Sequence, residues 1–164
     1  MHSEARGFVE KCLQSLPARR SVVEFGGKNI NGTVRGLFPG IPYISIDIEQ
    51  ASGVDIVADA ATYVPPFPPH TVVCCEVLEH SPYPHKIINN AYSILSGDGV
   101  FIVTTATDPR LPHSGVTGYL ELEPGEHYAN ISYNELHGWL VDAGFRSNSI
   151  DVSHEGDIWA MAVK

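Results

Sequence analysis

The segment VVCCEVLEHS at residues 72–81 constrains the fold of this chain more than any other, because an uninterrupted apolar run leads directly into two carboxylates and a histidine. Such a run is typical of a strand buried on both faces of a parallel sheet. In open α/β sheets, ligands bind in the crevice outside the carboxyl ends of these strands. We therefore expect residues 71–75 to form a central strand that delivers Glu76, Glu79 and His80 to a ligand crevice.

Three earlier apolar segments place an acid at or near their carboxyl ends in the same way. They are residues 21–25 with Glu24, residues 43–47 with Asp47, and residues 54–59 with Asp59. A glycine pair, Gly26 and Gly27, follows the first of them. Because the carboxyl ends of parallel strands share one edge of a sheet, we expect these acids to line the same crevice as Glu76.

Later segments predict how the sheet is completed. Apolar residues at helical spacing predict a helix over residues 84–95, and an apolar run predicts a strand over residues 100–105. Residues 146–153 and 157–163 predict an antiparallel hairpin. We expect an α/β fold, with a Rossmann-like, doubly wound, mostly parallel sheet that ends in a carboxyl-terminal antiparallel hairpin, in a three-layer sandwich. Helices should be minimal on one side, because residues 49–53 are too few for a helix and the run PPFPP forbids one.

The length of 164 residues suits one compact domain, so we expect residues 1–164 to form a single domain. An amino-terminal helix is predicted within residues 1–17. Residues 108–128 are rich in glycine, proline and histidine and exceed what a simple connection needs, which is typical of a substrate loop. Ser132 and Glu135 have the spacing of a capping box and predict the start of another helix.

Composition excludes several classes of partner. A net charge of −9 at pH 7 argues against a nucleic-acid partner, because an acidic surface repels phosphates. No apolar run is long enough to cross a bilayer, and the first residues lack the apolar core of a signal peptide. The three cysteines, two of them the adjacent Cys74 and Cys75, suit buried thiols in a reducing compartment. We expect a cytoplasmic monomer or homodimer that acts on a small-molecule substrate and does not contact membranes.

Taken in order, these motifs resemble the class I S-adenosylmethionine-dependent methyltransferases from about residue 21 to residue 163. The resemblance implies S-adenosylmethionine as the cofactor and in-line methyl transfer to a small-molecule or exposed oxygen or nitrogen acceptor. It implies that the glycine turn approaches the methionine part, that Asp47 binds the ribose hydroxyls, and that the third acid with its neighbour holds the adenine. The implied cofactor-binding residues are Glu24, Gly26, Gly27, Asp47, Ile48, Asp59, Ala60 and Glu76.

The glycine turn departs from the family pattern at Lys28, where the family has a second glycine. This lysine either forms a salt bridge with the cofactor carboxylate or obstructs the site. It therefore leaves open a catalytically inactive methyltransferase-like binding or accessory module. A nicotinamide-dependent oxidoreductase is disfavoured, because the turn GGKNING does not have the glycine spacing that places a pyrophosphate at a helix amino terminus.

His80 and His127 are the candidate catalytic residues, since a base is needed when the acceptor must lose a proton. The Glu-x-x-Glu-His spacing also resembles the metal-binding motif of ubiquinone-pathway O-methyltransferases and small-RNA 2′-O-methyltransferases. That resemblance implies a divalent metal held by Glu76, Glu79, His80 and His127. Without a metal, the two histidines position substrate or act as bases. Glu79 and His80 have a plainer interpretation as helix-cap residues.

Overall fold

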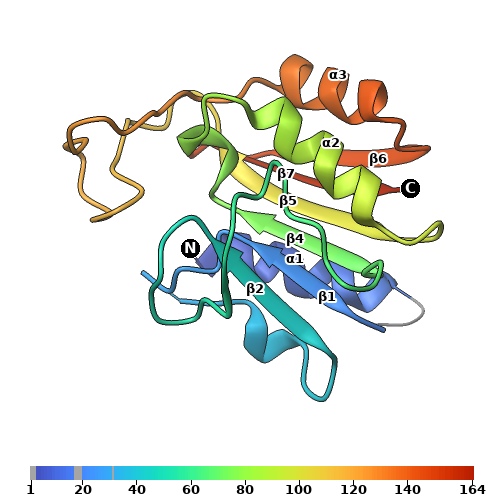
Figure 1. The fold of residues 1–164 in the computed structure, drawn as a ribbon. Coiled ribbons are helices and arrows are strands. Elements are labelled where there is room, and N and C mark those ends of the chain that lie inside the picture. The colour runs from blue at the N-terminus through green and yellow to red at the C-terminus, as the bar shows by residue number, and fades with distance from the viewer. Residues whose placement is uncertain (1–2, 17–19, 31) are drawn as a thin grey trace.

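The structure of the protein is a computed structural model that describes residues 3–16, 20–30 and 32–164. Its strands are β1 (Val22–Phe25), β2 (Tyr43–Asp47), β3 (Ile56–Val57), β4 (Thr71–Cys75), β5 (Val100–Ala106), β6 (Ser147–Val152) and β7 (Asp157–Val163). Its helices are α1 (Ser3–Ser15), α2 (Pro84–Ile94) and α3 (Tyr133–Ala143), with the short 3₁₀ helices η1 (Arg35–Leu37) and η2 (Leu78–His80). Figure 1 shows the strands in one sheet, with the helices packed against it.

The seven strands follow the order β3-β2-β1-β4-β5-β7-β6. Neighbours from β3 to β5 pair in parallel, whereas β7 runs antiparallel to both β5 and β6. The predicted fold class is therefore confirmed, including the carboxyl-terminal antiparallel hairpin. The central strand β4 has the bounds that its apolar run predicted, and all five of its residues are buried.

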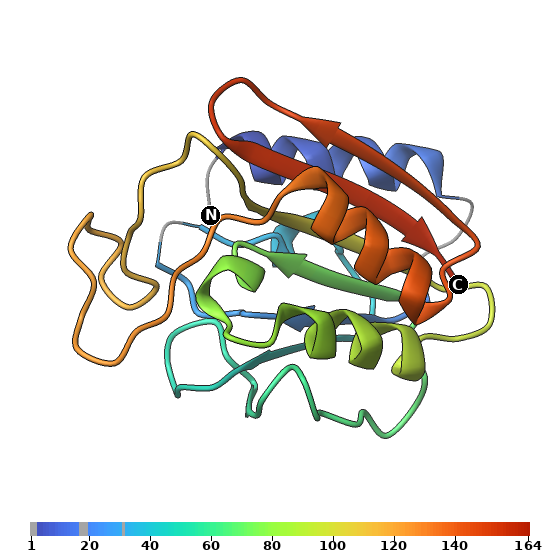
Figure 2. The ribbon, with the colours of Figure 1, turned by 90° about the horizontal axis from the view of Figure 1, so that it is seen from above.

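Helices cover the two faces of the sheet unequally. Buried side chains of α2 and α3 pack on one face, and those of α1 pack on the other. Figure 2 shows this three-layer arrangement from above. Successive strand residues point to opposite faces, so Cys74 belongs to the core under α2 and α3, and Cys75 to the core under α1. Both thiols are buried and free.

The connections around β3 are as short as the sequence predicted. Residues 48–70 contain β3 but no helix, and all of them are described. Strand β3 is shorter than the predicted 54–59, because Ile56 and Val57 pair only with β2 and stay exposed. Helix α1 lies within the predicted 1–17, of which residues 1, 2 and 17 are outside the described part. No helix in the described part is long and apolar enough to span a membrane.

Local sequence signals explain where α3 begins and ends. The Ser132 side chain accepts a hydrogen bond from the Glu135 backbone N–H, and the Glu135 side chain accepts one from the Ser132 backbone N–H. This is the predicted capping box. Gly144 ends the helix in the left-handed conformation, with φ of 104°, which glycine adopts without a steric penalty. The chain then returns to the sheet as β6.

Candidate functional site

The carboxyl ends of β1, β2 and β4 open into a cavity of about 1150 Å³. These strands are parallel neighbours, so their ends lie at one edge of the sheet. Residues between 109 and 127 of the loop after β5 also line the cavity. The structure brings all the expected cofactor residues to this cavity: Glu24, Gly26, Gly27, Asp47, Ile48, Asp59, Ala60 and Glu76.

Gly26 and Gly27 make a turn that only glycine can form at this place. Both backbone N–H groups donate to the carbonyl of Ile46, at 2.9 Å each. A Cβ on Gly26 would lie 2.1 Å from a methyl group of Val77, and φ of 76° disfavours any other residue there. A Cβ on Gly27 would lie 1.5 Å from the Ser45 hydroxyl. The turn is therefore packed tightly over the end of β2 and leaves the cavity above it open.

Asp47 is held at the end of β2 by two backbone hydrogen bonds. Its carboxylate accepts from the N–H of Lys28 at 3.1 Å and from the N–H of Glu49 at 3.2 Å. The side chain of Lys28 pairs with the Glu49 carboxylate at 2.8 Å. Lys28 therefore neutralises a neighbouring acid in this structure. Ile48, 71 % exposed, offers an apolar surface at the cavity wall.

Glu24 lies beneath the glycine turn and is 5 % exposed. Burial raises the pKa of its carboxyl group from 4.5 to about 7, against the opposing effect of the Tyr43 hydroxyl. Its Oε2 is buried next to the hydroxyls of Tyr43 and Ser45, whose hydrogen bonds with the carboxyl group act against the rise in pKa. Buried polar atoms require partners, and these three side chains supply them to one another beside the cavity.

Asp59 and Ala60 form a turn that α2 holds in place. The Asp59 carboxylate accepts a hydrogen bond from the N–H of Ala61 at 2.8 Å, which is a typical turn contact. Asn90 of α2 donates to the carbonyls of Ala60 and Tyr63, at 2.8 and 2.9 Å. The turn therefore keeps a fixed position at the cavity, although the strand that precedes it, β3, has only two residues.

Glu76 follows β4 in the left-handed conformation, with φ of 56°. Its Oε1 accepts a hydrogen bond from the Thr104 hydroxyl at 2.8 Å. Arg110, from the long loop, lies 3.8 Å from Glu76 and 3.3 Å from Asp157. These contacts turn the Glu76 carboxylate toward β5 and the base of the loop.

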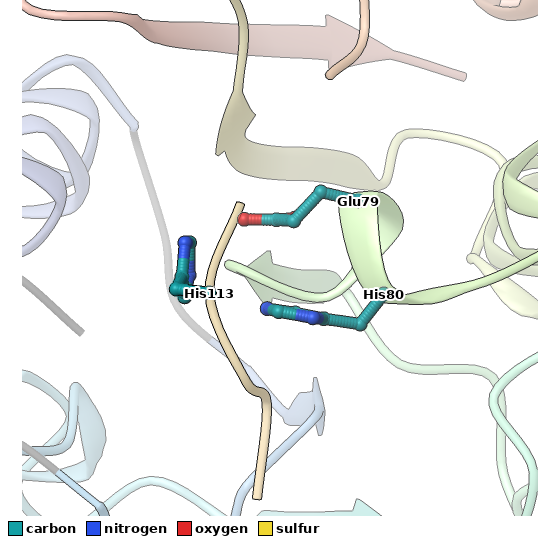
Figure 3. A group of neighbouring side chains, drawn as sticks. All are labelled: Glu79, His80 and His113. Atoms are coloured by element: carbon teal, nitrogen blue, oxygen red, sulfur yellow. The ribbon is translucent and has the colours of Figure 1, made fainter. Parts of the chain in front are cut away.

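Glu79, His80 and His113 come together where η2 meets the long loop (Figure 3). Glu79 is fully buried, and burial with the nearby charge of Glu76 raises the pKa of its carboxyl group. Burial, together with the neighbouring His113, lowers the pKa of His80 to about 4. His80 is therefore neutral at pH 7 and has a lone pair available to accept a hydrogen bond or bind a ligand.

His127 lines the cavity, as predicted, but its ring is not part of this group. Neither is Glu76, whose carboxylate is directed to Thr104 and Arg110. The four expected metal ligands therefore do not converge as one set in the described part of the chain. Two of them, Glu79 and His80, converge with a different histidine.

Sequence reasoning missed His113 and Arg110. His113 is 33 residues after His80 along the chain, in a loop without periodicity, so no spacing rule connects the two. Its place next to prolines and glycines in a predicted substrate loop was the only available signal. Arg110 carried a similar signal, as the single basic residue of that loop.

The comparisons with known proteins agree with this geometry. A family model described as "methyltransferase domain" matches residues 1–149. A search of the curated proteins found no match.

Several solved structures have a similar fold. The DhpI–SAH complex has a TM-score of 0.70 and 19 % identity over 97 % of this chain and 83 % of that chain. A 1,6-didemethyltoxoflavin-N1-methyltransferase from Burkholderia thailandensis, with bound 1,6-didemethyltoxoflavin and S-adenosylhomocysteine, has a TM-score of 0.69 and 14 % identity over 99 % and 77 %. The CMeT domain of the citrinin polyketide synthase has a TM-score of 0.69 and 16 % identity over 97 % of this chain and 51 % of that chain. The present chain thus spans about half the length of the last.

Proposed function

The chain belongs to the methyltransferase domain family, and from this premise we propose that it is an S-adenosylmethionine-dependent methyltransferase. The acceptor is a small molecule or an exposed oxygen or nitrogen group. One observation carries the proposal: a single cavity of about 1150 Å³ joins the glycine turn and Asp47 to the long loop. Sites for one drug-sized ligand usually measure about 300 to 1,000 Å³. This cavity therefore has room for a cofactor and an acceptor together.

The cofactor half of the cavity fits the proposed ligand. Gly26 and Gly27 line the cavity without side chains, so their backbone atoms can approach the methionine part. The Asp47 carboxylate is fixed by two backbone N–H groups and keeps further lone pairs for the ribose hydroxyls. Asp59 and Ala60 form the wall for the adenine, and Ile48 adds apolar surface beside it.

When bound, S-adenosylmethionine supplies an activated methyl group. The tasks left to the protein are to align the acceptor with that group and to exclude water. Alignment alone contributes about 7 to 11 kcal/mol in well-oriented reactions. The loop residues line the acceptor half, and the neutral His80 can accept a hydrogen bond from an acceptor hydroxyl and so position it.

The position of Lys28 no longer favours an inactive module. Its amine pairs with Glu49, so it does not by itself block the turn. The alternative, a catalytically inactive module, predicts cofactor binding without turnover, or no cofactor binding at all.

The test has two steps. Titration calorimetry of the full chain with S-adenosylhomocysteine should give one binding site per chain, and absence of binding would overturn the proposal. Incubation with S-adenosylmethionine and a panel of small phenols, carboxylic acids and amines should then release S-adenosylhomocysteine with at least one acceptor. Binding without release for every member of the panel would favour the inactive module.

A further inference from the structure

The group formed by Glu79, His80 and His113 has a property that cofactor binding does not explain. One potential ligand atom from each side chain lies within 4.8 Å of the other two. Figure 3 shows the three side chains pointing toward one another, two from η2 and one from the loop. We infer that these three residues bind a divalent transition-metal ion.

The donor set selects the class of ion. One carboxylate oxygen and two imidazole nitrogens suit Zn²⁺, Fe²⁺ or Mn²⁺, whereas Mg²⁺ and Ca²⁺ prefer oxygen donors alone. Three protein ligands leave at least one coordination position open, as in catalytic metal sites. His80 and His113 both line the cavity, so an open position would face the acceptor half.

The Glu79 carboxylate is already oriented by neighbouring groups. Its Oε2 accepts from the Thr105 hydroxyl at 2.7 Å, and its Oε1 accepts from the N–H of Ala106 at 3.3 Å. A carboxylate offers about four lone-pair sites, so these two bonds leave room for an ion. Within the described ranges, Glu79 forms no salt bridge with a lysine or arginine. In the ion-free chain a proton compensates this buried group, since the pKa of the Glu79 carboxyl is raised to about 8, and a bound cation would take the place of that proton.

Each histidine is also arranged as a ligand would be. Nδ1 of His113 lies 3.3 Å from the carbonyl of Leu111. Because a carbonyl only accepts, Nδ1 carries the proton and Nε2 keeps its lone pair. A hydrogen bond from the other ring nitrogen to a carbonyl is the usual second contact of a metal-binding histidine. The imidazole of His80 is buried at its Nδ1 and has a hydrogen-bond contact with the backbone of His127.

Gly115 fixes the ring of His80 from the loop side. A Cβ at this position would lie 3.1 Å from both Cγ and Nδ1 of His80. The loop backbone therefore packs directly on the imidazole and limits its rotation. Tyr128 borders the same ring edge-on, at 5.5 Å between centroids, and also borders His113 at 4.9 Å.

The ion would bind an oxygen donor of the acceptor, such as a hydroxyl, and lower the pKa of that hydroxyl. This role rests on the proposed methyl transfer, whereas binding of the ion does not. The site also differs from the ligand set that the sequence motif implied, because His113 replaces Glu76 and His127.

Calorimetric titration of the chelator-treated, dialysed full chain with Zn²⁺ alone, and separately with Mn²⁺ alone, tests the site. At least one of the two ions should bind with one ion per chain. His113→Ala should bind that ion at least about tenfold more weakly, since even the loss of an outer-shell partner costs about 10- to 100-fold. His85→Ala is the matched control, because His85 is an exposed histidine on α2 outside this group.

Two results would overturn the inference: no binding of either ion to the wild-type chain, or equal binding by wild type and His113→Ala. Circular dichroism is the control for folding and should show the same spectrum for His113→Ala, a loop variant, as for the wild type. Titration with S-adenosylhomocysteine in chelator separates the two proposals. Cofactor binding without an ion site refutes the metal alone, and an ion site without cofactor binding refutes the proposed function alone.

Discussion

Glu76 adopts an unfavourable backbone conformation at the cavity wall. Non-glycine residues rarely adopt a positive φ, and such a conformation costs on the order of 1 to 3 kcal/mol. The backbone N–H of Glu76 donates to the carbonyl of Thr104 at 2.9 Å, and its carboxylate accepts from the hydroxyl of the same residue. These bonds hold the strained residue at the cavity wall. Strained residues of this kind are concentrated in functional sites.

Asp47→Ala should weaken the binding of S-adenosylhomocysteine about ten- to hundredfold. A hydrogen bond to a charged group contributes about 1.5 to 3 kcal/mol, and about 1.4 kcal/mol corresponds to a factor of ten. Calorimetric titration measures the change. Asp98→Ala is the control, because Asp98 is an exposed acid that pairs with Arg20 outside the cavity. Unchanged affinity in a folded Asp47→Ala variant would refute the ribose assignment.

Glu24→Gln should stabilise the protein at alkaline pH. The folded chain holds the Glu24 proton up to about pH 7, whereas the unfolded chain releases it near 4.5. Stability from this group is therefore lost as pH rises between these values. The glutamine amide does not ionise, so the variant does not lose this stability. Its free energy of unfolding at pH 8.5 should therefore exceed that of the wild type by up to about 3 kcal/mol.

Urea denaturation of wild type and Glu24→Gln at pH 4.5 and pH 8.5 tests this. The difference between the two proteins should be small at the lower pH and large at the higher one. An equal difference at both values would show that packing, and not ionisation, is responsible. We also expect the variant to bind S-adenosylhomocysteine more weakly, because Glu24 lines the cavity.

At the scale of elements, the strands could be predicted and the loop contacts could not. The run 71–75 predicts a strand buried on both faces, because it is short, apolar without interruption and rich in β-branched residues. The capping box fixes the start of α3 for an equally local reason. The positions of Asp47 and Glu76 follow from these strands. The grouping of His113 with His80 does not, because it depends on how a loop without periodicity folds back on η2.

The loop after β5 is expected to change its mobility when ligand binds. Figure 1 shows it extending from the body of the molecule. Its apolar side chains at Leu111, Tyr119 and Leu120 are 64 %, 76 % and 69 % exposed. Leu111 and Leu120 also line the cavity, so a bound ligand gives them a surface to contact.

Limited proteolysis with chymotrypsin measures this change. Cleavage after Tyr119 or Leu120 should slow when S-adenosylhomocysteine is added to the wild-type chain. The Asp47→Ala variant is the control and should show less protection at a ligand concentration close to the wild-type dissociation constant. Equal cleavage rates for wild type with and without the ligand would contradict closure of the loop by the cofactor.

The whole molecule should unfold as one cooperative unit. The core under α2 and α3 joins residues from the first half of the chain, such as Phe25 and Ile46, to residues from the second half, such as Leu140 and Ala162. Elements that share one core unfold together. Differential scanning calorimetry should give one transition whose calorimetric and van't Hoff enthalpies agree. Two resolved transitions would contradict the expected single domain over residues 1–164.

The two outermost strands of the sheet are poor places for another chain to attach. Strand β3 offers only two residues, and β6, Ser147–Val152, carries polar side chains at four of its six positions, including the charged Asp151. Long, flat and apolar sheet edges recruit neighbouring molecules and start aggregation. A molecule that ends its sheet in this way, and carries a net charge of −9, resists self-association through strand addition.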